Sequence, residues 1–143
     1  NDMSDGADTL RKQVSSHRDY LIANNARTHI RWAWHEFFGE YDAVIAPMMS
    51  TPAFAHDHRR FGERTINVDG EERPYFEQIF WASLAINSYL PSTVFPTGPG
   101  EEGLPIGLQI IGPQYGDLTT IALAGYLEAA GFGFQAPKGY GSD

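Results

Sequence analysis

The chain has 143 residues, of which 42% are hydrophobic and 13% aromatic, enough for one domain with a packed core rather than a disordered segment. Its formal net charge of −8 argues against a nucleic-acid backbone or an anionic membrane surface as the main partner. The lack of cysteine excludes disulfides, thiol nucleophiles and thiolate metal ligands. With no signal-peptide pattern and no apolar run of the roughly 20 residues that a spanning helix needs, we expect a cytoplasmic protein without a membrane partner.

Residues 8–39 are predicted to form one long or kinked amphipathic helix. Apolar side chains recur at helical spacing from Leu10 to Phe37, across a polar step at Asn24-Asn25, and Gly39 is expected to end the helix. The basic residues fall mostly off this apolar stripe, so they form either a solvated helix face or, alternatively, an anion-binding face. These residues are Arg11, Lys12, Arg18, Arg27 and Arg31.

Residues 42–130 are predicted to form a sheet with helices. The short apolar run at 43–47 is typical of a buried strand that ends at Pro47, and Asp69-Gly70 favours a tight turn closing a small hairpin around residues 65–68. Pro74 suits a first helical turn. Because the stretch from Tyr75 to Asn87 is apolar on nearly every side, we expect it to be a buried helix.

Two more strands and a final helix complete the expected domain. Residues 92–95 and 105–111 have strand patterns joined by a glycine-rich link, and a helix capped by Asp117 should end at Gly131. Strands separated by helices predict an α/β fold, a layered mixed sheet flanked by helices, with residues 1–143 forming a single unit.

Two local patterns are candidates for a metal or cofactor site. His56-Asp57-His58 places two imidazoles and a carboxylate together, which could contribute to a zinc or copper site. However, alternate residues of an extended segment point opposite ways, and no third ligand stands at a suitable spacing. The glycine segment at 98–103 carries no lysine, so it does not form a phosphate loop. We therefore predict no metal and no cofactor.

Two long segments in this order resemble the last third of amidase-signature enzymes. They run from residue 18 to 57, RDYLIANNARTHIRWAWHEFFGEYDAVIAPMMSTPAFAHD, and from 86 to 117, INSYLPSTVFPTGPGEEGLPIGLQIIGPQYGD. The most specific piece is GLPIGLQIIGP at 103–113, in which Gly107 is expected to relieve a close contact in an interior strand and Gln109 to orient a local hydrogen bond. The resemblance implies a partial, C-terminal amidase-signature fold.

The resemblance also implies chemistry that this chain does not carry by itself. Members of the family cleave or transfer carboxamides with a serine nucleophile that is relayed through a second serine to a lysine, in two segments upstream of the resembled part. The only lysines here are Lys12 and Lys138, and neither stands in that context. We therefore assign no catalytic residue to the chain and expect it to be inactive alone.

Substrate-binding residues are expected on the helix before Asn87 and after the first strand. Seven positions before Asn87, tRNA-dependent glutamine amidotransferase relatives carry an aspartate and fatty-amide-hydrolysing relatives an apolar residue. Here that position is Phe80. An apolar acyl or aryl pocket is one interpretation and plain core packing the other. The candidate pocket residues are Phe80, Leu84, Met48 and Met49; Tyr89 departs from the small glycine usual near that point.

The sequence thus predicts the C-terminal part of an amidase that hydrolyses a carboxamide C–N bond to an acid and an amine or ammonia. The expected partner is a small-molecule amide, with no nucleic acid, and an exposed sheet edge makes a homodimer conceivable. The alternative is a non-catalytic binding or assembly module on an amidase scaffold. Transamidation of a charged tRNA is a further subclass, against which Phe80 and the acidic charge both count.

Overall fold

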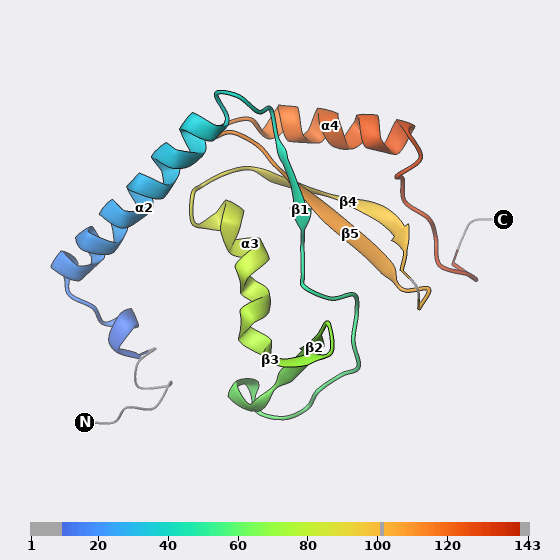
Figure 1. Cartoon of the computed structure of the whole chain (residues 1–143), viewed down its shortest axis with the longest axis horizontal. Helices are drawn as coiled ribbons and strands as arrows, with labels where there is room; N and C mark the ends of the chain where they lie inside the picture. Colours follow the sequence, from blue (N-terminus) through green and yellow to red (C-terminus); the bar gives the residue numbers. More distant parts are fainter. Residues whose placement is uncertain (1–9, 101, 141–143) are drawn as a thin grey trace.

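A computed structural model describes residues 10–100 and 102–140. Figure 1 shows a small sheet with one long helix along it and other helices leading away from it. The sheet contains β1 (Val44–Pro47), β4 (Ser92–Pro99) and β5 (Pro105–Ile111) in the order β1-β5-β4. The α/β fold class is confirmed. Both pairings are antiparallel, which corrects the prediction of mixed strand directions within the described residues. The short link from β4 to β5 allows only an antiparallel pair.

The hydrophobic core lies around the central strand β5. Ile110 and Ile111 at its end are fully buried, and Ala46 of β1 and Phe95 of β4 pack beside them. Helix α4 (Asp117–Ala129) covers β4 and β5 on one face (Figure 1). The helix is tied to the sheet by Thr120, whose hydroxyl lies 2.8 Å from that of Thr93. The end of β5, where residues 109–111 are all buried, therefore lies at the centre of the core.

The first long helix begins later than predicted. Helix α2 (His17–Phe37) starts after Ser16, whose hydroxyl accepts a hydrogen bond from Asp19 N at 3.2 Å as an N-cap. The chain therefore breaks at Ser15-Ser16, whereas the polar Asn24-Asn25 step lies inside the continuous helix. None of residues 17–37, all of which are described, is buried. In Figure 1 the helix extends away from the sheet.

The helix before Asn87 forms but is not buried as predicted. A 3-10 turn η2 (Tyr75–Gln78) leads into α3 (Ile79–Ile86), and Ala85 is the one residue of α3 that is buried. Phe80 is 57% exposed and Ile86 68% exposed. The apolar composition predicted burial on all sides, but the described residues bury Ala85 and only partly cover residues 81–84.

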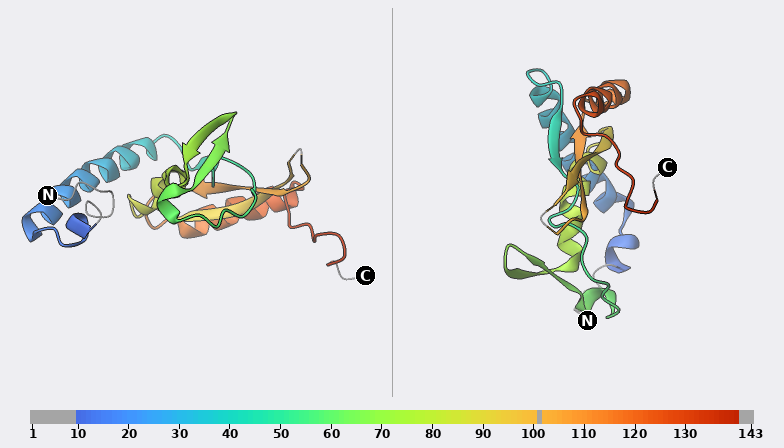
Figure 2. Two further views of the ribbon diagram at one scale, coloured as in Figure 1. Left: turned by 90° about the horizontal axis from the view of Figure 1, so that it is seen from below. Right: turned by 90° about the vertical axis from the view of Figure 1, so that its right-hand side faces the viewer.

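The predicted hairpin is confirmed. Strands β2 (Thr65–Val68) and β3 (Glu71–Pro74) pair antiparallel, and Asp69 and Gly70 between them have φ values of 53° and 88°. Two left-handed residues in a row make the turn whose twist matches that of a hairpin. Together with the short 3-10 helix η1 (Phe61–Glu63), the hairpin forms a lobe that projects from the rest of the chain (Figure 2).

The entry to α4 differs by one residue from the prediction. Gly116 is the N-cap and Asp117 is the first helical residue, where its carboxylate interacts favourably with the positive end of the helix dipole. Gly131 follows the helix with φ 106°, as predicted. A Cβ on Gly107 would lie 3.4 Å from Phe95 O, an ordinary contact, but on Gly112 it would lie 2.6 Å from Thr120 Cγ2. Close approach therefore requires a glycine at position 112 rather than at 107.

Candidate functional site

Two adjoining pockets lie where the chain leaves β1 and passes α3. One, of about 550 Å³, is lined by Phe80 and Ser83 of α3 and by Arg73 and Glu77. The other, of about 520 Å³, is lined mainly by apolar residues, including Met48, Met49, Val94 and Leu108. Ser50 lines both pockets and so marks the point where they meet.

The structure brings together three of the four predicted pocket residues. Phe80 lies in the first pocket, and Met48 and Met49 lie in the second. Leu84, one turn beyond Phe80, is half-buried and lines neither. Phe80 packs edge-on against Trp81, with ring centroids 5.2 Å apart, but its exposure of 57% corrects the interpretation of it as a core residue within the described chain.

Gln109 of β5 braces the wall between these pockets. The side chain is 1% exposed, and its Nε2 donates to Pro47 O at 2.8 Å and to Trp81 O at 2.9 Å. Its Oε1 accepts from Ser92 Oγ at 3.0 Å. One amide therefore joins β1, α3 and β4 to the central strand. The same hydrogen bonds satisfy a buried polar group that would be destabilising if it were left unpaired.

Ser50 is held by residues that the sequence analysis did not single out. Its backbone N donates to Oε1 of the buried Gln78 at 3.0 Å, and its hydroxyl accepts from Trp81 Nε1 at 3.2 Å. The ionisable residues that line the two pockets are Arg73 and Glu77, which pair with each other at 3.5 Å. The described surroundings of Ser50 thus contain no histidine or lysine that could serve as its base.

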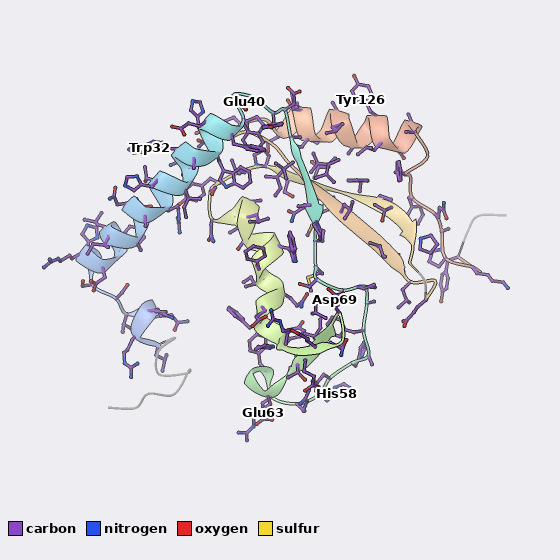
Figure 3. All side chains as sticks on the ribbon, in the orientation of Figure 1. Trp32, Glu40, His58, Glu63, Asp69 and Tyr126 are labelled. Atoms are coloured by element: carbon purple, nitrogen blue, oxygen red, sulfur yellow. The ribbon has the colours of Figure 1, made fainter. Side chains whose placement is uncertain are left out.

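The histidine pair considered as a metal site lies in the lobe around the hairpin. Figure 3 shows His58 there, far from Trp32 on α2. The rings of His56 and His58 lie 6.0 Å apart, but Asp57 between them is engaged by Arg59, whose Nε and Nη2 both donate to the carboxylate. No group of three possible metal ligands occurs among the described residues. The absence of a metal in the working protein stays a prediction.

The Asp57 carboxylate is expected to titrate well below an ordinary aspartate. Hydrogen bonds from the Arg59 side chain, and then from the Arg59 backbone N, lower the pKa of Asp57 from 3.8 to about 2. The interaction therefore stabilises this loop fully above pH 3.8, and the contribution is lost as the pH falls through about 2. Carboxyl ¹³C shifts in an NMR titration measure this directly.

Arg59→Gln should return the pKa of Asp57 toward its ordinary value. Arg60→Gln is the matched control, since the neighbouring Arg60 side chain does not contact the carboxylate among the described bonds. A pKa as low in the Arg59 variant as in the unmodified chain would show that the Arg59 side chain is not its main cause, since the backbone N–H of residue 59 is kept.

The amidase family profile matches residues 2–121. This chain belongs to the amidase family. Among its relatives is a component of the glutamyl-tRNA(Gln) amidotransferase from Brevibacillus brevis, 33% identical over 121 residues that make up 83% of this chain and 23% of the relative. The protein of the same name from Beijerinckia indica is 34% identical over 115 residues, 78% of this chain and 21% of the relative.

Solved structures share the fold of this chain. A vestigial protein complex described as revealing the origins of an s-triazine catabolic enzyme superposes with a TM-score of 0.74 at 24% identity, covering 90% of this chain and 27% of that one. A bacterial aryl acylamidase of the amidase-signature family gives a TM-score of 0.64 at 27% identity, covering 90% and 26%. The chain thus spans about a quarter of the length of the proteins it matches.

No described helix is both long and apolar enough to cross a bilayer. The cytoplasmic location stays a prediction. The absence of a nucleic-acid partner also stays a prediction, and the names of curated relatives, glutamyl-tRNA(Gln) amidotransferases, bear on it.

Proposed function

We propose that this chain supplies the C-terminal part of an amidase, forming one wall of the pocket in which a small carboxamide is hydrolysed to an acid and an amine or ammonia. The observation that carries the proposal is the pair of pockets meeting at Ser50, with Phe80, Met48 and Met49 on their walls. Family membership supports the class of reaction. Neither a metal nor an organic cofactor is part of the proposal.

The walls favour an apolar acyl or aryl group on the amide. Phe80 offers a ring that is more than half exposed, and the Met48 pocket is lined mainly by apolar side chains. Thioethers and aromatic rings adapt to apolar ligands of varied shape. Arg73 and Glu77, the charged residues of the first pocket, form an exposed ion pair at 3.5 Å, so together they add no net charge to it.

Surface area supports the proposal that more polypeptide covers this chain in the working enzyme. The accessible surface is 11178 Å², whereas a compact monomer of 15.9 kDa exposes about 7400 Å². Large apolar side chains account for part of the excess, among them Ile79, Phe80 and Ile86 on α3. A surface of this kind marks an interface rather than a finished exterior.

The first test is hydrolysis by the purified chain, and we expect none. An activated serine needs a base within hydrogen-bond reach, and the described neighbours of Ser50 are a tryptophan and a glutamine. Release of aniline from an aryl amide, or of ammonia from a primary amide, should not exceed a matched blank. Turnover that survives repurification and disappears in Ser50→Ala would show that the chain is a complete catalyst.

Transamidation of a charged tRNA is the second candidate, favoured by the names of the curated relatives. Phe80 stands against it, because a ring cannot pair with the polar end of glutamine. Comparing glutamine with an aryl amide as substrates of the intact enzyme separates the two candidates. A non-catalytic binding module remains the alternative if the intact protein cleaves neither.

A further inference from the structure

A third pocket, of about 480 Å³, lies between α2 and the link from β5 to α4. It shares no lining residue with the two pockets that meet at Ser50. Its polar walls are Arg31, His35 and Gln114, and its apolar walls include Trp32, Phe38 and Leu90. Figure 3 shows Trp32 on α2, well away from the hairpin lobe with His58 and Glu63.

Arg31 has unused hydrogen-bonding capacity in this pocket. Its Nη2 donates to Gln114 Oε1 at 2.9 Å, which uses one of the five N–H donors of a guanidinium. Its Nε is shielded from solvent and has no partner among the described residues. A charged donor that is shielded and unpaired is destabilising, so an acceptor that draws the guanidinium toward it is favoured.

The Tyr89 ring lies against the guanidinium of Arg31. The Arg31 Cζ atom lies 5.3 Å from the centre of the Tyr89 ring, and Arg27 lies over the same ring and donates to its hydroxyl. Tyr89 reaches this place with a left-handed backbone, φ 57°. Both cations thus lie within cation–π distance of one aromatic ring, which attracts them without neutralising their charge.

No carboxylate balances these cations in the described part of the chain. Apart from Arg11, the arginines described there form two ion pairs, Arg59 with Asp57 and Arg73 with Glu77. Neither pair involves Arg27 or Arg31. None of the described residues that line the pocket is acidic. In a chain of net charge −8, this is a local positive site with room for a ligand.

We propose that this pocket binds a small organic carboxylate, with its anionic head at Arg31 and its apolar body against Trp32, Phe38 and Leu90. A guanidinium matches the planar, two-oxygen geometry of a carboxylate. His35, one helical turn from Arg31, supplies an imidazole N–H at the same pocket. The apolar walls favour an aryl or alkyl carboxylate over inorganic phosphate, which would leave them without a partner.

The test is a titration of the purified chain with sodium benzoate, followed through the Arg31 Nε–H signal in ¹H–¹⁵N NMR. We expect a saturable shift of that signal with benzoate and no saturable shift with benzyl alcohol. Inorganic phosphate should bind at least about tenfold more weakly than benzoate. Arg31→Gln should weaken benzoate binding about tenfold or more, as measured through the Trp32 indole N–H signal. Arg31→Lys should weaken it by less, because lysine keeps the charge but loses the planar fork.

Arg18→Gln is the matched control, since Arg18 is exposed on the same helix but outside the pocket. It should leave the benzoate affinity unchanged, and the backbone amide spectrum of each variant reports whether the fold is retained. Three outcomes would overturn the proposal: no saturable shift in the unmodified chain, equal binding of benzyl alcohol or phosphate, or an affinity that is retained in a folded Arg31→Gln.

Discussion

Replacing Gln109 by Ala is expected to destabilise the chain by about 2–5 kcal/mol, because a buried amide that makes three hydrogen bonds is removed. The carbonyl oxygens of Pro47 and Trp81 would each lose a donor. Urea denaturation followed by far-UV circular dichroism measures the change in the free energy of unfolding.

Gln109→Glu should be nearly as harmful as Gln109→Ala. The carboxylate keeps the shape of the side chain but cannot donate to the two carbonyl oxygens, and it places a charge at a position that is 1% exposed. Gln135→Ala, in the exposed segment after α4, is the matched control and should change stability by less than about 0.5 kcal/mol. Equal effects at positions 109 and 135 would show that the amide does not brace the wall.

The strands and the hairpin could be predicted because their signals are local. Alternating Ile106, Leu108 and Ile110 predict a strand, which forms as β5 although its buried residues are the consecutive 109–111, and Asp69-Gly70 provides the left-handed pair that the hairpin turn needs. The predicted start of α2 is wrong for an equally local reason: Ser16 prefers to cap a helix rather than continue one, but the apolar spacing across it suggests continuity.

The burial of α3 and the composition of the pockets could not be predicted from local patterns. An apolar helix is expected to be covered, but the pattern does not say which polypeptide covers it, and of residues 79–86 Ala85 alone is buried within this chain. Ser50, Gln78 and Trp81 meet through contacts between segments about 30 residues apart. Gln109 stands out in the sequence as a lone amide in an apolar strand, but its partners on three elements become visible only in three dimensions.

Phe80 determines what the proposed enzyme accepts, if the pocket at α3 is its substrate pocket. The ring is exposed toward that pocket rather than packed in a core, and the neighbouring charges of Arg73 and Glu77 are paired. A large apolar substrate group can cover the ring and lose contact with water, whereas a small polar group gains nothing from it. The preference should therefore depend on the size of this side chain.

Phe80→Ala, made in the intact amidase of which we propose this chain is a part, should reduce discrimination between large apolar and small polar amides by about 1–3 kcal/mol. Ratios of kcat/KM for the two substrate classes measure this directly. Leu84→Ala is the matched control, because Leu84 lies one turn along α3 and lines neither pocket; it should lower stability but leave the ratios unchanged. If both variants lose stability and neither changes the ratios, Phe80 packs against another part of the enzyme and does not contact the substrate.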